Sequence, residues 1–198
     1  MMADYTTVDI PGASEGAPAF FLFHGTGSDE HQFTDLAAEL KPGARRIGVR
    51  GDVSEGGALR YFKRVGEGRY DMADLARATR KLAAWVPAAA PTGERIALGY
   101  SNGANIIAAT LFETPDTFDV AVLMHPLIPF TPAPQPGLNG KRIIITAGRR
   151  DPIVPVHAAE LLVQYLKDQG ADVALFWHEG GHEIRREELL AVRDFLNG

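Results

Sequence analysis

The chain has 198 residues, a length that suits one α/β core and is short for two domains. Its net charge is −5, from 20 Lys and Arg against 25 Asp and Glu, and it has no long basic run; both features argue against nucleic-acid or anionic-membrane partners. No apolar run reaches the roughly 18 residues that insert stably into a bilayer. The absence of cysteine excludes disulfides, thiolate metal ligands and a cysteine nucleophile. Because the first sixteen residues, MMADYTTVDIPGASEG, do not resemble a secretory signal, we expect a cytoplasmic protein.

Short β-rich runs alternate with amphipathic segments along the chain. Most of these runs are continuously apolar, as expected for parallel strands that helices cover on both faces. The segments between them carry apolar residues at helical spacing, and Asp71 is the expected N-cap of one such helix. The alternation predicts an α/β fold, a single doubly wound and mostly parallel sheet in one domain over residues 1–198. The predicted strands cover residues 19–24, 45–50, 95–100, 119–125, 141–148 and 172–178, with 5–10 as a weaker edge strand.

A glycine-rich loop follows the first strong strand, in the stretch FLFHGTGSDE at residues 21–30. This loop lacks the third glycine of a dinucleotide-binding fingerprint, and no segment of the chain reads as a phosphate-binding Walker A motif. His24 precedes the first glycine of the loop. We interpret it as a brace for the loop rather than as a catalytic base.

Ser101 lies in a Gly-x-Ser-x-Gly motif, GYSNG at residues 99–103, where a predicted strand gives way to a helix. The flanking glycines permit a sharp turn that exposes the serine oxygen above the strand ends. The helix that follows presents unpaired N–H groups and the positive end of its dipole to developing negative charge. The alternative is a glycine-rich turn with a helix-capping serine. The motif and its context together favour Ser101 as a nucleophile.

Two further strand ends carry an acid and a base. Asp151 lies in AGRRDPIVP (147–155), just beyond a strong strand, and His182 lies in HEGGHEI (178–184), after the last strand. An aspartate beside proline is commonly a turn or capping residue, and a lone loop histidine is commonly a surface group. The chain order Ser101, Asp151, His182 is nevertheless the order of an α/β-hydrolase catalytic triad, so we predict that the three act together.

The same stretch also satisfies the zinc-protease pattern His-Glu-x-x-His, at residues 178–182. That chemistry requires a helix, on which histidines four residues apart share one face. Two adjacent glycines in the middle would each cost about 1 kcal/mol relative to alanine in a helix. The preceding residues also read as a strand. We therefore predict no metal site here.

The chain resembles the small phospholipase/carboxylesterase family of α/β-hydrolases over nearly its whole length. The stretches that carry the resemblance are HGTGSDE, RGDVSEGGALRYFKR, YDMADLARATRKL, GYSNGAN, AGRRDPIVP and GGHEIRREEL. They look most like the bacterial esterase-like subgroup, with acyl-protein thioesterases as a more distant branch. The resemblance implies the triad Ser101, Asp151 and His182, with oxyanion-binding backbone N–H groups from Thr26 and Asn102. A chain of this length leaves no room for a large cap domain.

These features predict a serine carboxylesterase that needs no metal or cofactor and cleaves small to medium esters through an acyl-enzyme on Ser101. Thioesterase or lysophospholipase activity remains open, because the same triad serves all three reactions. An inactive α/β-hydrolase fold that binds a small apolar ligand is the alternative from another class. We expect a small-molecule ester as partner, and a monomer or homodimer. The residues expected to line the substrate pocket are Tyr61, Phe62, Leu127, Ile128, Ile153 and Val154.

Overall fold

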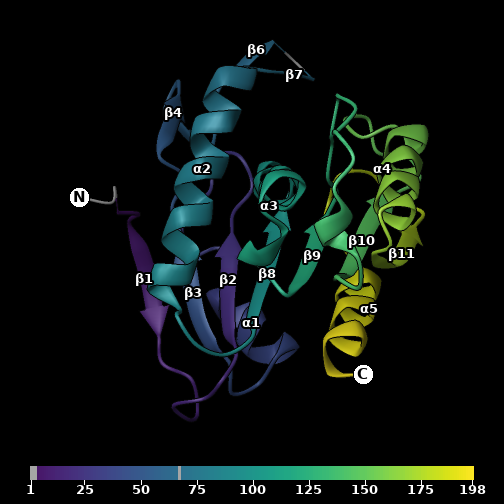
Figure 1. The fold of residues 1–198 in the computed structure, drawn as a ribbon. Helices are drawn as coiled ribbons and strands as arrows, with labels where there is room; N and C mark the ends of the chain where they lie inside the picture. Colours follow the sequence, from purple (N-terminus) through teal and green to yellow (C-terminus); the bar gives the residue numbers. More distant parts are fainter. Residues whose placement is uncertain (1–3, 67) are drawn as a thin grey trace.

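A seven-stranded sheet forms the middle layer of the protein, with the order β1-β3-β2-β8-β9-β10-β11 (Figure 1). The computed structural model describes residues 4–66 and 68–198. Strand β1 runs antiparallel to β3 at one edge, and all other neighbours in this sheet are parallel. The predicted α/β fold is confirmed, including the edge strand. The seven strands are β1 (Thr7–Ile10), β2 (Ala19–Phe23), β3 (Arg45–Val49), β8 (Arg95–Tyr100), β9 (Val120–Met124), β10 (Arg142–Gly148) and β11 (Asp172–His178).

In the part of the chain that the structure describes, five α-helices cover the two faces of the sheet. Helices α2, α3 and α4 lie on one face, and α1 and α5 lie on the other (Figure 1). The central strands β2 and β9 are buried along their whole length, which explains why they read as continuous apolar runs. Within residues 4–66 and 68–198, no helix is long and apolar enough to cross a membrane. The helices are α1 (Thr34–Leu40), α2 (Met72–Ala89), α3 (Asn102–Glu113), α4 (Val156–Asp168) and α5 (Arg186–Asn197).

Helix α2 begins where the sequence predicts. The Asp71 side chain accepts a hydrogen bond from the backbone N–H of Asp74 at 3.0 Å, as an N-cap does. The buried face of α2 includes Leu75, Leu82 and Val86, which pack into the larger of the two apolar cores.

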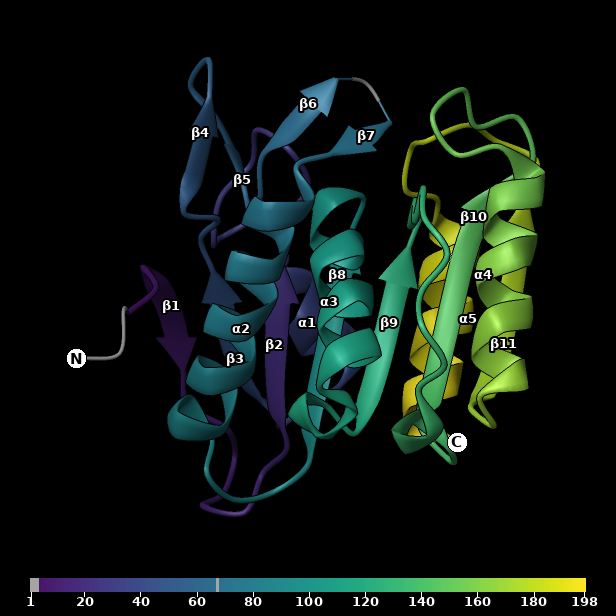
Figure 2. The same cartoon turned by 45° about the horizontal axis from the view of Figure 1, so that its top comes forward.

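Two short hairpins that the sequence does not predict stand beyond the carboxyl ends of the parallel strands (Figure 2). One pairs β4 (Val53–Glu55) with β5 (Ala58–Arg60), and the other pairs β6 (Arg64–Gly66) with β7 (Arg69–Tyr70). Strands of two or three residues are too short to produce an alternating pattern. Their placement matters because they carry side chains to the edge of the sheet where the catalytic candidates gather.

Candidate active site

The catalytic candidates come from four strands that are neighbours in the sheet, β8, β9, β10 and β11. Ser101 follows β8, His125 follows β9, Asp151 follows β10, and His182 lies in the loop after β11. Because these strands are parallel, their carboxyl ends meet at one edge of the sheet. This is the position where open α/β sheets commonly place their ligand sites.

Ser101 occupies a sharp turn between β8 and α3. Its backbone has φ 52° and ψ −114°, a conformation that non-glycine residues rarely adopt and that costs on the order of 1–3 kcal/mol. The flanking residues must be glycines, because neighbouring backbone leaves no room for a Cβ at either position. A Cβ at Gly99 would lie 2.4 Å from the Gly103 carbonyl, and one at Gly103 would lie 2.2 Å from the carbonyl oxygen of Phe23. The turn therefore has the geometry of a nucleophile elbow.

Ser101, His182 and Asp151 form one continuous chain of hydrogen-bonding atoms. The Oγ of Ser101 lies 3.0 Å from Nε2 of His182, and Nδ1 of His182 lies 2.7 Å from Oδ2 of Asp151. The other carboxylate oxygen of Asp151 accepts backbone N–H bonds from Ile153 and Val154, at 2.8 and 3.0 Å. The structure thus brings the three predicted residues together, with His182 between Ser101 and Asp151.

The environment of Asp151 favours its ionised form. Burial alone would raise the pKa of this carboxyl, but hydrogen bonds from His125, His182 and the two backbone N–H groups outweigh burial and hold the pKa well below its usual range. An ionised Asp151 fixes the proton of neutral His182 on Nδ1 and leaves Nε2 free to accept the serine proton.

The loop after β2 approaches Ser101 from the neighbouring strand. His24 is buried, and its Nε2 accepts the Gly51 N–H at 2.9 Å while its Nδ1 lies 2.7 Å from the Gly25 carbonyl. This histidine braces the loop, as expected, and burial lowers its pKa. The hydroxyl of Thr26 accepts a hydrogen bond from Arg60 at 2.8 Å, which ties the loop to the β4–β5 hairpin. The sequence offers no signal for this contact.

A cavity of about 310 Å³ opens beside Ser101. Of the six predicted pocket residues, Leu127, Ile153 and Val154 line it. The prediction is wrong for the other three. Tyr61 and Phe62 are fully buried core residues, and Ile128 faces a separate groove beside α4. Among the described residues, the cavity is also lined by residues that the sequence does not predict to be there: Arg60, Arg64, Gly68, Tyr70, Tyr100, Asn105 and His125.

Tyr61 shows that an aromatic residue in a predicted loop can belong to the core and not to a pocket wall. Its ring packs against Phe23, and its hydroxyl donates to the Val49 carbonyl at 2.6 Å and accepts the His24 N–H at 3.0 Å. Its backbone N–H bonds the side chain of Asn102 at 2.8 Å. The residue therefore holds three strand ends together from beneath the site and does not face the cavity.

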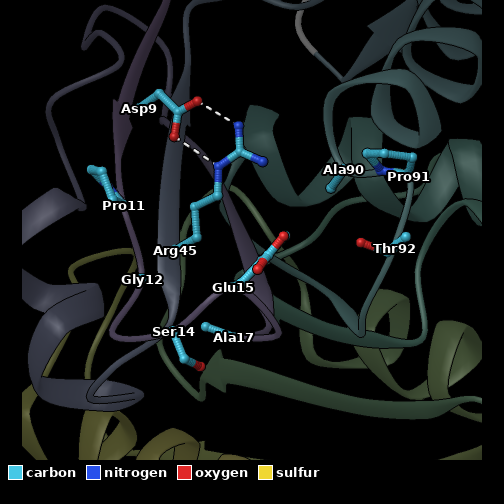
Figure 3. Close-up of a pocket in the computed structure, with 11 residues that line it drawn as sticks. Asp9, Pro11, Gly12, Ser14, Glu15, Ala17, Arg45, Ala90, Pro91 and Thr92 are labelled. Carbon is cyan, nitrogen blue, oxygen red and sulfur yellow. Dashed lines mark hydrogen bonds and ion pairs between the residues drawn. The ribbon is translucent and has the colours of Figure 1, made fainter.

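A second hollow, of about 600 Å³, is lined in part by Asp9, Arg45 and Pro91 (Figure 3). Its main charged side chains are already paired with each other, since Arg45 contacts both carboxylate oxygens of Asp9 at 2.9 and 2.5 Å. This hollow is remote from Ser101, because Arg45 begins strand β3 whereas Ser101 follows the end of β8. We assign it no catalytic role.

The His-Glu-x-x-His stretch does not lie on a helix. His178 ends β11 and His182 lies in the following loop, where they turn to different partners. Among the described residues, two trios have ligand atoms close enough to hold a metal, His125–Asp151–His182 and His125–His178–Glu188. However, Nδ1 of His178 accepts the Gly180 N–H at 3.0 Å. In neutral His178 the proton then sits on Nε2, the atom that would have to bind the metal, whereas a ligating histidine normally donates through its other nitrogen.

Comparisons with known proteins agree with this geometry. The dienelactone hydrolase family matches residues 61–186. The protein MhqD of Bacillus subtilis (strain 168), provisionally classed as a hydrolase, is 40% identical over 179 residues, covering 88% of this chain and 90% of its own. A Bacillus cereus carboxylesterase structure has a TM-score of 0.92 at 33% identity, over 98% of this chain and 94% of that one. The Agrobacterium tumefaciens (strain C58) protein Atu2452, of unknown function, is 52% identical with a TM-score of 0.91, over 98% and 96% of the two chains. The predicted resemblance to α/β-hydrolase esterases is confirmed.

Proposed function

The chain belongs to the dienelactone hydrolase family and is a carboxylic ester hydrolase, and we propose that it cleaves small to medium esters through an acyl-enzyme on Ser101. The observation that carries this proposal is the continuous contact from Ser101 Oγ through His182 to Asp151. The 33% identical carboxylesterase of Bacillus cereus supports an ester as the substrate class.

In the proposed reaction, Ser101 attacks the acyl carbonyl while Nε2 of His182 removes the hydroxyl proton. The resulting imidazolium then donates that proton to the leaving alcohol. Asp151 holds the ring in the required orientation and stabilises its positive charge. Water then attacks the acyl-enzyme while Nε2 of His182 removes one of its protons. The bond between the acyl carbon and Ser101 Oγ breaks, the acid leaves, and His182 returns the proton to Ser101. The first of these proton transfers joins two atoms, Ser101 Oγ and His182 Nε2, that already lie 3.0 Å apart.

We further propose that the backbone N–H groups of Thr26 and Asn102 bind the oxyanion. Both residues line the cavity that contains Ser101 and His182. Asn102 is the first residue of α3, so its N–H has no acceptor within the helix and carries the positive end of the helix dipole. A donor of this kind contributes about 3 kcal/mol to stabilising the transition state. Arg60 supports the arrangement because it fixes the Thr26 hydroxyl.

The size of the cavity supports a compact acyl or aryl group. A volume of about 310 Å³ is at the low end for ligand pockets, and Leu127 and Val154 give it apolar walls. Thioesterase and lysophospholipase activities are the alternatives within hydrolases, since they use the same three residues. The cytoplasmic location and the monomeric or dimeric state stay predictions from the sequence.

The test is a kcat/KM series on p-nitrophenyl esters from acetate to palmitate, with a thioester and a lysophospholipid measured alongside. We expect the highest kcat/KM for acyl chains of about two to eight carbons, in keeping with the pocket volume. Ser101→Ala should lower it by at least about 10³-fold, and the exposed-site control Ser14→Ala should leave it unchanged. A clear preference for the thioester or the lysophospholipid would replace the ester proposal while keeping the triad. A fully active Ser101→Ala would overturn both.

A further inference from the structure

A buried cluster that the proposed reaction does not use lies directly behind Asp151. It consists of His125 after β9, His178 at the end of β11 and Glu188 in the first turn of α5. The side chains of all three are fully buried. Burying ionisable groups costs several kcal/mol unless they are paired, so the three groups are expected to compensate one another's charge.

The two ring nitrogens of His125 face two different carboxylates. Nδ1 lies 3.0 Å from Oδ2 of Asp151, and Nε2 lies 3.2 Å from Oε2 of Glu188. The same Oδ2 of Asp151 also faces Nδ1 of His182 at 2.7 Å. Only a doubly protonated ring can donate to both carboxylates, because a neutral ring would turn a lone pair toward one of them.

Glu188 is held as an acceptor from several sides. It accepts hydrogen bonds from the Thr146 hydroxyl at 2.6 Å and from the Arg185 backbone N–H at 2.5 Å. Burial would raise the pKa of Glu188, but its hydrogen bonds with His125, Thr146 and the Arg185 N–H lower the pKa. An ionised Glu188 favours a cationic partner, and of the two histidine rings that face it His125 is the nearer, at 3.2 Å against 3.4 Å for His178.

The backbone at His125 is an independent observation. Its φ is 51°, in the left-handed region that non-glycine residues seldom occupy. The only other described non-glycine residue with positive φ is Ser101. Strained backbone of this kind persists where the surrounding contacts require it, and here it turns the His125 ring between Asp151 and Glu188.

We propose that His125, held as an imidazolium between Asp151 and Glu188, is a positioning residue that fixes the Asp151 carboxylate for His182 and offsets part of its charge. This inference rests on the proposed function, since it takes Asp151 and His182 as members of the triad. The unit that supports catalysis then extends from Ser101 through two histidines and two acids to α5.

The electrostatic environment agrees with this assignment. Burial lowers the pKa of His125, but its hydrogen bonds to Asp151 and Glu188 outweigh burial and raise the pKa to about 9. His178 offers no hydrogen-bond acceptor to the His125 ring, because Nδ1 of His178 already accepts the Gly180 N–H. Its Nε2 proton faces Glu188 at 3.4 Å and His125 Nε2 at 3.2 Å. The titratable groups that face His125 from the elements packed around it are Tyr100, Asp151, His178, His182 and Glu188.

The first test is ¹⁵N NMR of the histidine rings in the unmodified protein, with His125→Asn used to assign the signal. We expect both His125 nitrogens to show imidazolium shifts at pH 7 and to titrate near pH 9. Glu188→Gln should move that titration to lower pH by at least about one unit, because it removes one of two buried carboxylate partners. Glutamine can still accept the Arg185 N–H, so the start of α5 is preserved. The matched control is Glu187→Gln, which removes the same charge from the exposed neighbour.

A neutral His125 at pH 7, accepting its hydrogen bond from His178, would overturn the proposal. The proposal would also be overturned if His125 titrated at the same pH in Glu188→Gln and in Glu187→Gln. These readouts need no enzymatic activity, so they stand even if the proposed function fails. Failure of the triad itself would be seen separately, as full activity of Ser101→Ala.

The second test is the pH profile of kcat/KM for His125→Asn. Asparagine tolerates positive φ and can still donate to Asp151, but it carries no charge. Removing the cation leaves the negative charge of Asp151 uncompensated, so the acid limb of the kcat/KM profile should move to higher pH by about one unit. His31→Asn is the matched control on an exposed histidine. An unshifted acid limb in folded His125→Asn would reduce His125 to a packing residue and contradict the proposal.

Discussion

The carboxylate of Asp151 and the imidazole of His182 lie 2.7 Å apart although 31 residues separate them in the chain. Strand β11 and helix α4 fill that interval, and the parallel pairing of β10 with β11 brings the two loops back to one edge of the sheet. Asp151→Asn should lower kcat by about 10³- to 10⁴-fold, because an amide turns an N–H toward Nδ1 of His182 and favours the wrong tautomer. The measurement is kcat on the best p-nitrophenyl ester.

The control for this variant is Asp116→Asn, which changes a carboxylate that is 93% exposed. Circular dichroism must show that Asp151→Asn is folded, since its side chain is fully buried. A folded variant that keeps more than about a tenth of the normal kcat would place the triad acid elsewhere.

The stability of the protein should fall on the alkaline side of neutrality because of His125. Its folded-state pKa of about 9 lies above the ordinary value of 6.5, so its stabilisation is complete below about pH 6.5 and is lost as pH rises through 9. The upper limit of this loss is about 3 kcal/mol. Thermal unfolding at several pH values should show a decline between pH 6.5 and 9.5 that is smaller in His125→Asn. Parallel curves for the two proteins would contradict the assignment, and His31→Asn should follow the unmodified protein.

The fold around the site could be predicted largely because the central strands are buried on both faces. Continuous apolar runs identify β2, β8, β9 and β10, and the order of Ser101, Asp151 and His182 in the chain selects which strand ends matter. His125 carries the same signal, a polar residue at the end of a predicted strand, but nothing near it in the sequence identifies its partners. Its partners lie 26 and 63 residues further along the chain, and only the sheet order shows that β9 lies between β8 and β10.

Other features could not be read from the sequence, for physical reasons. The hairpins that carry Arg60 and Arg64 have strands of two or three residues, too short for a periodic pattern. Tyr61 and Phe62 follow directly, and an apolar pair in a loop fits a pocket wall as well as a core. The choice depends on tertiary packing, since Tyr61 fills the space beneath the loop that contains His24.

Gly103 should be irreplaceable even by alanine. A Cβ there would lie 2.2 Å from the carbonyl oxygen of Phe23, so α3 would have to move away from β2. We expect Gly103→Ala to lower the free energy of unfolding by at least about 2 kcal/mol, as overpacking of a tight contact does. Urea unfolding measures this directly. The control is Gly16→Ala, where nothing lies within 4 Å, and an equal effect of both substitutions would argue against the close approach.

Chelators should leave the activity unchanged. The prediction rests on the Gly180 N–H bond to Nδ1 of His178, which places the ring proton where a metal would bind. The measurement is esterase activity after dialysis against EDTA and again after zinc is added. Loss in EDTA with recovery on zinc would show that His178 or His182 acts as a ligand.

The most direct test of the central claim is covalent labelling of the nucleophile. The strained turn at Ser101 and the 3.0 Å contact of its Oγ with His182 should make this hydroxyl reactive toward a fluorophosphonate probe. The account predicts one modified site, mapped by peptide mass spectrometry to Ser101, with labelling lost in Ser101→Ala and retained in Ser14→Ala. Labelling that survives Ser101→Ala, or no labelling of the folded protein at all, would contradict it.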